Sequence, residues 1–333
     1  MPKKSIIPVF VPHLGCAHDC VFCNQRRISG QTEPMSARGA DEAIRRSLDK
    51  IGYGAEIEIA FYGGSFTAIP LEEQEALLGV AANFISAGRV SSLRLSTRPD
   101  CIDADTLDRL KRYGVGTIEL GSQSMCDDVL KKSGRGHTAE DTKKAAALIK
   151  ERGFSLVLQM MTGLPGDTRE KALFTAREIA SLEPSGVRIY PTVIVRDTAL
   201  YELWKSGKYK EHTVDEAVEW CADIVSVFED AGIPVIRLGL NPTEALSEGD
   251  AAGGAYHPAF GELVRSRSYL RRAEAEIEAR GGSARTLGVE RSQISMAVGQ
   301  KRCNILALEK KFGLRGLKII AADVKRGDIE VME

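Results

Sequence analysis

The stretch Cys16-Ala-His-Asp-Cys20-Val-Phe-Cys23 places three of the chain's seven cysteines in one short segment, shortly after the apolar run Ile6–Val11. Three thiols so close together are poor candidates for disulfides in a cytosolic chain, because that compartment is reducing and the number is odd. Thiolates select zinc or iron–sulfur clusters. A structural zinc site needs a fourth ligand, from His13, His18 or a distant cysteine, whereas a four-iron cluster on three cysteines leaves one iron open. The spacing therefore predicts a metal site and leaves its metal undecided.

Outward from this stretch, the first 240 residues alternate apolar runs with amphipathic helical stretches. The expected strands are Ile6–Val11, Ile57–Tyr62, Ser92–Thr97, Gly116–Leu120, Ser155–Met161, Val187–Tyr190 and Val235–Leu240. The expected helices are Ala37–Ile51, Leu71–Ser86, Ala104–Tyr113, Ala139–Glu151, Arg169–Ser181 and Val214–Asp230, with Asp103 and Thr168 as N-caps. Apolar residues fill nearly every strand position, which predicts a parallel sheet covered by helices. Six or seven such units favour a complete or partial βα barrel over a short open sheet, and periodicity does not separate a six-unit open barrel from a closed eight-unit one. Of these, we expect a partial (β/α)6-type TIM barrel.

We expect the chain to divide at residue 240, into a core barrel over 1–240 and a small C-terminal α/β extension over 241–333. Residues 241–257 are rich in Gly, Ala and Pro, which predicts a long loop. The extension then continues with a charged helix at Glu262–Arg280, a short helix, and a pair of strands at Leu317–Ala321 and Asp328–Val331.

The 333 residues carry 45 Lys and Arg against 46 Asp and Glu, a net charge of −1. This balance gives no global argument for a nucleic-acid or membrane partner and leaves a local basic patch to consider. No apolar run approaches the ~18 residues of a membrane span. The apolar N-terminal stretch is short, is interrupted by Pro8 and Pro12, and has no small-residue cleavage site. We therefore expect a cytoplasmic protein with no membrane and no DNA partner.

A second motif, Tyr62-Gly-Gly-Ser-Phe66, ends the second expected strand, as the cysteine loop follows the first. Barrels of this kind place their chemistry at the C-terminal ends of their strands. A Cys-x3-Cys-x2-Cys loop, with the aromatic Phe22 between its last two cysteines, together with this glycine turn resembles the radical S-adenosylmethionine (SAM) superfamily.

Further segments narrow the resemblance to the radical-SAM domain of the Elongator catalytic subunit, a tRNA wobble-uridine modification enzyme. They are Ser96-Thr-Arg-Pro-Asp100, Glu119-Leu-Gly-Ser-Gln-Ser124, Arg135-Gly-His-Thr138, Tyr190-Pro-Thr-Val-Ile-Val-Arg196 and Tyr201–Gly207. The chain departs from that family in three ways. Its cysteine loop is the compact superfamily form, Ser96 stands where many relatives carry Glu, and the tail is too short for an acetyltransferase-like domain. For the last reason, acetyl transfer to tRNA is not carried over.

The resemblance implies that Cys16, Cys20 and Cys23 ligate a [4Fe–4S] cluster whose open iron binds SAM through its amino and carboxylate groups. One electron then cleaves the sulfonium and yields a 5′-deoxyadenosyl radical that abstracts a substrate hydrogen. The implied SAM contacts are Gly63, Gly64, Ser65 and Phe66 near the methionine amino group, Arg135 at the carboxylate, Ser96 at the ribose and Phe22 at the adenine. Gln123 and Gln159, expected at the ends of strands four and five, are further ribose candidates. A solvated surface arginine and satisfied core amides are the alternatives for Arg135 and the two glutamines.

Tyr190, Arg196 and Lys205 lie in the Elongator-like segments and are the candidate substrate contacts. The two cations would meet phosphates, unless they are ordinary solvated surface. The resemblance implies a tRNA or other RNA substrate, and we expect a flavodoxin- or ferredoxin-type electron donor as a further partner. Radical chemistry on a small molecule such as a tetrapyrrole, as in oxygen-independent coproporphyrinogen oxidase, is the first alternative. A non-catalytic zinc-binding module is the second.

Overall fold

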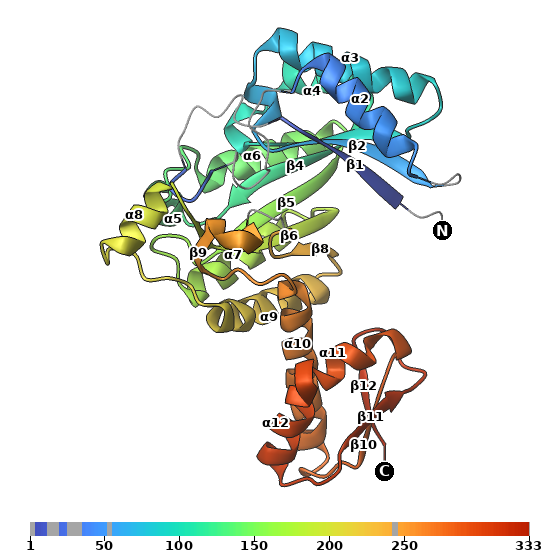
Figure 1. Cartoon of the computed structure of the whole chain (residues 1–333), viewed down its shortest axis with the longest axis vertical. Helices are drawn as coiled ribbons and strands as arrows, with labels where there is room; N and C mark the ends of the chain where they lie inside the picture. Colours follow the sequence, from blue (N-terminus) through green and yellow to red (C-terminus); the bar gives the residue numbers. More distant parts are fainter. Residues whose placement is uncertain (1–3, 12–19, 25–34, 52–54, 242–245, 333) are drawn as a thin grey trace.

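The computed structural model describes residues 4–11, 20–24, 35–51, 55–241 and 246–332. Seven parallel strands form one curled sheet in the order β1-β2-β3-β4-β5-β6-β8 (Figure 1). They are β1 Lys4–Phe10, β2 Glu56–Tyr62, β3 Ser92–Thr97, β4 Val115–Gln123, β5 Ser155–Thr162, β6 Gly186–Pro191 and β8 Val235–Leu238. Because β1 and β8 are the two edges of the sheet, the barrel is partial, and the predicted fold class is confirmed.

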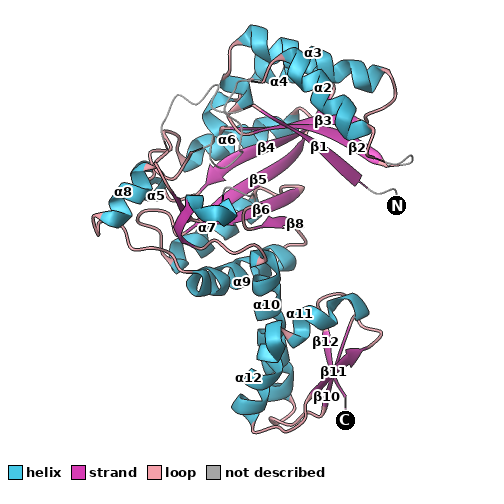
Figure 2. Ribbon diagram, viewed as in Figure 1, coloured by secondary structure: helices cyan, strands magenta, loops and turns pink. Residues whose placement is uncertain are grey.

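Helices pack on the outer face of this sheet (Figure 2). They are α2 Ala37–Leu48, α3 Leu71–Ser86, α4 Ala104–Arg112, α6 Ala139–Glu151, α7 Arg169–Ser181 and α9 Val214–Asp230, and the shorter α5 Asp127–Lys132 and α8 Ala199–Lys205 also occur. The six expected helices are confirmed. So are both N-caps, because the side chains of Asp103 and Thr168 accept backbone hydrogen bonds in the first turns of α4 and α7. Within the described ranges, no helix is long and apolar enough to cross a membrane.

Side chains alternate between two environments along the strands. Ile59 and Leu95 face the helices and are fully buried in the main core. Their neighbours Glu58 and Arg94 point to the opposite, concave side of the sheet. The expectation that apolar residues fill nearly every strand position is therefore wrong. Helices cover only one face, so only that face needs to be apolar.

A short antiparallel ladder joins β7 (Val193–Val195) to β9 (Ala251–Gly254). β9 and a helical turn at Leu246–Asp250 both lie within 241–257, so the long loop predicted there is wrong over its described part. Gly254 makes the ladder sterically allowed. Its φ is +79°, and a Cβ at this position would lie 2.7 Å from a backbone carbonyl oxygen of the facing segment.

The long helix α10 (Phe260–Ala279) is shared by two hydrophobic cores. Val264 belongs to the barrel core, whereas Ile277 belongs to a second core that packs against a three-stranded sheet. This sheet has the order β11-β10-β12, with β10 Thr286–Val289, β11 Lys318–Ala321 and β12 Ile329–Met332, and α11 Ile294–Val298 and α12 Cys303–Phe312 complete this part of the chain. The two expected strands exist but do not pair with each other, because β10, which the pattern missed, lies between them.

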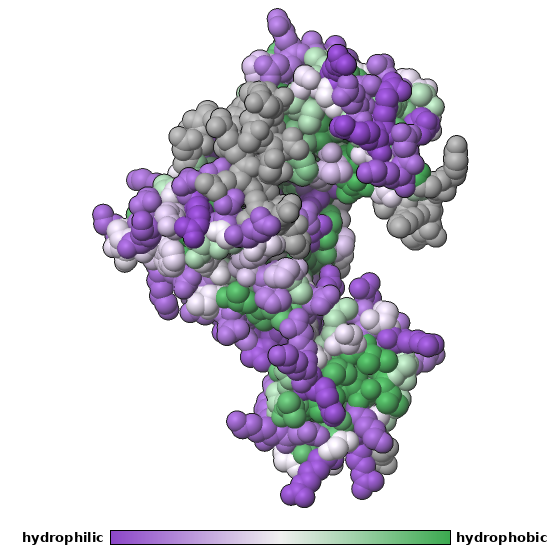
Figure 3. All heavy atoms as spheres, viewed as in Figure 1, coloured by the Kyte–Doolittle hydropathy of each residue, from purple (hydrophilic) through white to green (hydrophobic). Residues whose placement is uncertain are grey.

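The C-terminal part stands apart from the barrel in Figure 1, and Figure 3 shows apolar side chains gathered on its visible face. Ile320 of β11 is 41% exposed. The helix α10 belongs to both cores, and the division of the chain at residue 240 stays a prediction.

Candidate functional site

The described part of the cysteine loop, residues 20–24, holds two of the three predicted metal ligands. Cys20 and Cys23 are both half-buried. The backbone N–H of Cys23 donates to the Cys20 carbonyl at 3.0 Å, which places both residues on one tight turn. Cys16 lies outside the described residues, among which no three metal-ligating side chains come together.

Backbone hydrogen bonds fix this loop from two sides at Val21. The Val21 N–H donates to the Ser133 carbonyl at 3.1 Å, and the Val21 carbonyl accepts from the Leu200 N–H of α8 at 2.7 Å. The side chains of Val21 and Phe22 pack against an apolar cluster that includes Leu200. The loop is thus held against α8, and the predicted contact of Phe22 with the adenine stays a prediction.

Arg135 lies beside the cysteine loop, in the segment after α5, and is only 7% exposed. Its Nη1 donates to the Cys20 Sγ at 3.3 Å, and its Nη2 donates to the carbonyl of Gly121 on β4 at 2.7 Å. Its own carbonyl accepts a hydrogen bond from the Arg98 guanidinium. The alternative of a solvated surface arginine is therefore wrong, because both Nη groups are committed to the loop and the sheet.

Motifs that are far apart in the sequence meet at this point. Arg98 of Ser96–Asp100 supports the backbone of Arg135, and the Glu119–Ser124 segment accepts from its side chain. Two residues further on, the His137 Nε2 lies 3.2 Å from the carbonyl oxygen of Ser122 in the same segment. Burial, and then the Arg135 guanidinium, lower the pKa of His137 to about 4, so this ring is neutral near pH 7.

The motif Tyr62-Gly-Gly-Ser-Phe66 forms the turn after β2, next to Val11, which follows β1. The Val11 N–H donates to the Tyr62 carbonyl at 2.7 Å. Gly63 has a φ of +99°, which favours glycine, and the last two residues of the motif are buried. The Oγ of Ser96 lies 3.5 Å from the Gly64 carbonyl oxygen. The structure therefore places Ser96 beside the glycine turn.

Gln123 and Gln159 contact each other, because the Gln159 Nε2 donates to the Gln123 Oε1 at 3.2 Å. Gln123 ends β4, is buried, and has a φ of +63°, a conformation that is uncommon for a residue with a side chain. Gln159 lies within β5, three residues before its end, so the prediction that it ends the strand is wrong. Ribose contact by either amide stays a prediction.

An ion-pair network on the concave face was missed by the sequence prediction. Glu119 of β4 is 4% exposed and pairs with Arg94 of β3 at 2.9 Å and with Arg188 of β6 at 2.8 Å. Arg94 also pairs with Glu58 at 2.7 Å, and the Tyr62 hydroxyl donates to the Glu119 Oε1 at 2.8 Å. Burial, and then the Glu119 carboxylate, raise the pKa of Tyr62. Charged residues at alternate positions of otherwise apolar strands were the signal for this network.

Arg196 and Lys205 lie together on the surface, whereas Tyr190 lies elsewhere. The two exposed cations sit over the ring of Tyr201, 5.9 and 5.3 Å from its centroid. Arg196 also donates to the Tyr201 hydroxyl at 3.4 Å. Tyr190 is half-buried on β6, two residues from Arg188. Of the three candidate substrate contacts, the structure brings two together.

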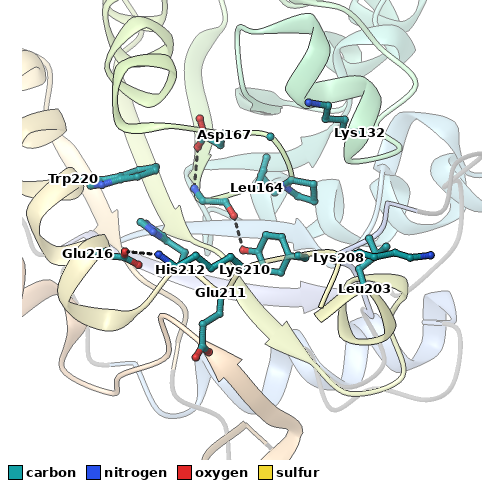
Figure 4. A pocket seen from close by; sticks show the side chains of 14 residues that line it. Lys132, Leu164, Asp167, Leu203, Lys208, Lys210, Glu211, His212, Glu216 and Trp220 are labelled. Carbon is teal, nitrogen blue, oxygen red and sulfur yellow. Dashed lines mark hydrogen bonds and ion pairs between the residues drawn. The ribbon is translucent and has the colours of Figure 1, made fainter. Parts of the chain in front are cut away.

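A pocket of about 590 Å³ opens beside the turn after β5 (Figure 4). The chain turns tightly here, because the Asp167 N–H donates back to the Leu164 carbonyl at 2.8 Å. Tyr209 closes the wall by donating its hydroxyl to the Gly163 carbonyl at 2.6 Å. No predicted site residue lines this pocket. Its lining includes the basic residues Lys132, Lys208 and Lys210 and the acidic residues Asp167, Glu211 and Glu216.

A partial parallel barrel with a cysteine loop after its first strand and a glycine turn after its second defines a class of protein. Residues 10–179 match the family model of the Radical SAM superfamily, and residues 184–272 match that of the Radical_SAM C-terminal domain. The chain belongs to the Radical SAM superfamily and is an enzyme of that type.

Among curated proteins, the chain is 29% identical over 256 residues to the tRNA uridine(34) acetyltransferase of Methanocaldococcus jannaschii, covering 65% of this chain and 47% of that protein. It is 31% identical over 228 residues to Elongator complex protein 3 of Saccharomyces cerevisiae, covering 61% of this chain and 40% of that protein. The chain thus spans less than half the length of these two relatives.

Solved structures share the fold. The archaeal Methanocaldococcus infernus Elp3 with an N-terminal deletion superposes with a TM-score of 0.63 at 24% identity, covering 86% of this chain and 65% of that one. Coproporphyrinogen III oxidase from Escherichia coli gives a TM-score of 0.50 at 17% identity over 70% of this chain and 54% of that one. At these identities the likeness shows the fold alone.

Proposed function

We propose that the chain binds a [4Fe–4S] cluster at Cys16, Cys20 and Cys23 and uses SAM to start radical chemistry on an RNA substrate. Such a cluster, with one iron left open, supplies the electron that cleaves the sulfonium of SAM to a 5′-deoxyadenosyl radical. The donor set fits this group. Cys20 and Cys23 share one turn, and a buried guanidinium faces the Cys20 sulfur, where it complements the negative charge of a thiolate ligand.

The residues around the loop have the chemistry to orient SAM. The Nε of Arg135 is buried and has no hydrogen-bond partner in the described part of the chain, so it is a free donor for the SAM carboxylate. We propose that the turn at Gly63–Ser65 binds the methionine amino group of SAM. Ser96, Gln123 and Gln159 are then the contacts of its ribose. Their role is to hold SAM in one orientation and to keep water away from the reacting atoms.

The observation that supports an RNA substrate is the surface cluster of Arg196, Tyr201 and Lys205 on and beside α8. Arg196 and Lys205 supply cations for phosphates, and Tyr201, whose ring centroid lies 6.1 Å from that of Trp204, supplies an aromatic surface for bases. The Leu200 N–H of the same helix is bonded to the cysteine loop, so RNA on this cluster would lie next to the proposed reaction centre. The name of one curated relative, tRNA uridine(34) acetyltransferase, supports tRNA as that RNA.

The cofactor assignment is tested on protein reconstituted without oxygen, with dithionite in place of a flavodoxin- or ferredoxin-type donor. We expect about four iron and four sulfide per chain, and conversion of SAM to 5′-deoxyadenosine. Combined Cys16→Ala, Cys20→Ala and Cys23→Ala should abolish both, whereas Cys126→Ala, outside the loop, should preserve both. Zinc without acid-labile sulfide in the parent protein would contradict the proposal and favour a non-catalytic zinc module.

The RNA assignment is tested by binding of total tRNA at several salt concentrations. Arg196→Gln combined with Lys205→Gln should weaken binding and reduce the slope of log K against log [salt] by up to about two. The matched control combines Arg315→Gln with Lys318→Gln, which removes two exposed cations near or on the C-terminal sheet. Two results together would favour the small-molecule alternative. They are absence of tRNA binding at low salt and formation of 5′-deoxyadenosine from SAM that depends on an added tetrapyrrole.

A further inference from the structure

Arg135 donates a hydrogen bond to Cys20 that is not needed to hold the cysteine loop in place. Two backbone hydrogen bonds already hold this loop at Val21, one to the segment before Arg135 and one to α8. The Arg135 Nη1 nevertheless donates to the Cys20 Sγ at 3.3 Å. A charged donor on a ligand sulfur acts on the electron density of the sulfur and of any metal bound to it.

The surroundings hold the guanidinium in this orientation. Its Nη2 donates to the Gly121 carbonyl at 2.7 Å, and a Cβ on Gly121 would lie 3.2 Å from the same Nη2 and 2.8 Å from the Gln123 Nε2. Glycine thus leaves the room that the arginine occupies. On the other side, Arg98 donates to the Arg135 carbonyl and is itself tied to Asp100 at 2.9 Å. Because Arg135 is 7% exposed, solvent screens its charge poorly.

We propose that Arg135 raises the reduction potential of the cluster bound by the cysteine loop, through its hydrogen bond to Cys20. This inference rests on the proposed function. A cluster becomes more negative when it accepts an electron. A buried cation that donates to a ligand sulfur stabilises this reduced state more than the oxidised state, so reduction becomes easier. Arg135 is then a positioning residue that acts through Cys20 and eases the entry of the electron on which SAM cleavage depends.

The test measures the cluster potential of the full chain by EPR at controlled potentials. SAM is left out, so that a contact between Arg135 and the SAM carboxylate plays no part. Arg135→Met keeps the length of the side chain and removes its charge and donors. We expect reduction to become about tenfold less favourable, which is about 59 mV for a one-electron couple. Arg135→Lys keeps the charge and should give an intermediate potential.

Lys132→Met is the matched control. Lys132 lies three residues before Arg135, and its side chain is 57% exposed. Removing its charge should leave the potential unchanged, because water screens it and it does not contact Cys20. A fall in potential as large as that of Arg135→Met would assign the effect to net charge and overturn the inference.

Two further outcomes would overturn it. One is an equal potential in the parent, Arg135→Met and Arg135→Lys. The other is loss of the cluster from both variants while circular dichroism shows the native fold, since Arg135 would then serve cluster assembly. If the parent protein binds no [4Fe–4S] cluster, its iron and sulfide content shows this before any variant is measured. The proposed function then fails first, and this inference with it.

Discussion

Glu119 is the acceptor that three side chains of the concave face share. Arg94, Arg188 and Tyr62 all donate to its carboxylate, which is 4% exposed. Burying charges costs solvation, and an apolar replacement of such a network is often equally stable. The network is therefore poor evidence for extra stability. It ties β2, β3, β4 and β6 together on the face that the proposed site uses, and keeps their side chains in one arrangement.

Replacing Glu119 by Gln removes the charge that compensates two buried guanidinium groups. We expect Glu119→Gln to lower the free energy of unfolding by about 3–5 kcal/mol, measured as a shift of the urea midpoint. Glu58→Gln is the matched control. Glu58 pairs with Arg94 alone, and Arg94 keeps Glu119 as a partner, so a smaller loss is expected. Equal midpoints for the two variants would contradict the central place of Glu119.

Asp167 gives the chain a pH dependence of stability that can be isolated. Burial raises the pKa of Asp167 to about 7, against the opposing effect of the N–H groups of Gly163 and Thr168, which donate to its carboxylate. The folded chain therefore keeps this proton up to about pH 7, whereas the unfolded chain releases it near the ordinary pKa of an aspartate, 3.8. The stabilisation from the protonated Asp167 side chain is complete below pH 3.8, the unfolded pKa. It is lost as the pH rises through the folded pKa of about 7.

We expect Asp167→Asn to remove a fall in stability on the order of a few kcal/mol between about pH 5 and about pH 8. Thermal unfolding across that range measures it. Burial lowers the pKa of His212 to about 4, and protonation of this ring opposes the Asp167 effect below its unfolded value of 6.5. The parent and the variant both carry this His212 effect, so the difference between their stabilities at each pH isolates Asp167. A variant that keeps the slope of the parent protein would show that Asp167 is ionised throughout.

At the scale of elements, the turn after β5 depends on the absence of a side chain at Gly163. Its φ is +76°, and a Cβ there would run into the His212 ring. Gly153 has nearly the same φ, +77°, with nothing within 4 Å of the added Cβ, so it is a matched control. Gly153→Ala should cost about 1 kcal/mol for its backbone conformation, and Gly163→Ala about 1–3 kcal/mol more for overpacking. Equal urea midpoints would mean that the ring moves aside freely.

The same scale shows how far the sequence could predict the structure. The seven barrel strands and six helices were found because strands and helices alternate regularly along this part of the chain. The missed strands β7, β9 and β10 have three or four residues each, and β9 reads Ala-Ala-Gly-Gly, which carries no alternation of polarity. The burial of Arg135 was not predictable, because its partners Cys20 and Gly121 lie 115 and 14 residues away in the sequence. Tertiary packing, which local patterns do not encode, brings them together.

At the scale of the whole molecule, α10 joins the barrel to the C-terminal part. Its first turns carry Val264 into the barrel core, and its second half carries Ile277 into the C-terminal core. Salt bridges also tie the helix to α9: Arg271 pairs with Glu219 and Asp223, both at 2.5 Å. The two cores have separate side chains but share one backbone. A helix shared in this way can make the two cores unfold together. It can instead open in its middle, so that the two cores unfold separately.

Two matched leucine substitutions distinguish these outcomes. Leu308 of the C-terminal core and Leu95 of the barrel core are both fully buried, and replacing either by Ala should cost about 3–5 kcal/mol within its own core. If the cores unfold separately, Leu308→Ala raises hydrogen exchange over residues 270–332, including the second half of α10, and leaves Phe260–Val264 protected. Leu95→Ala then gives the reverse pattern. Equal loss of protection across the chain in both variants would mean that α10 makes the molecule one cooperative unit. Substitutions at the C-terminal end would in that case also weaken the barrel that holds the proposed site.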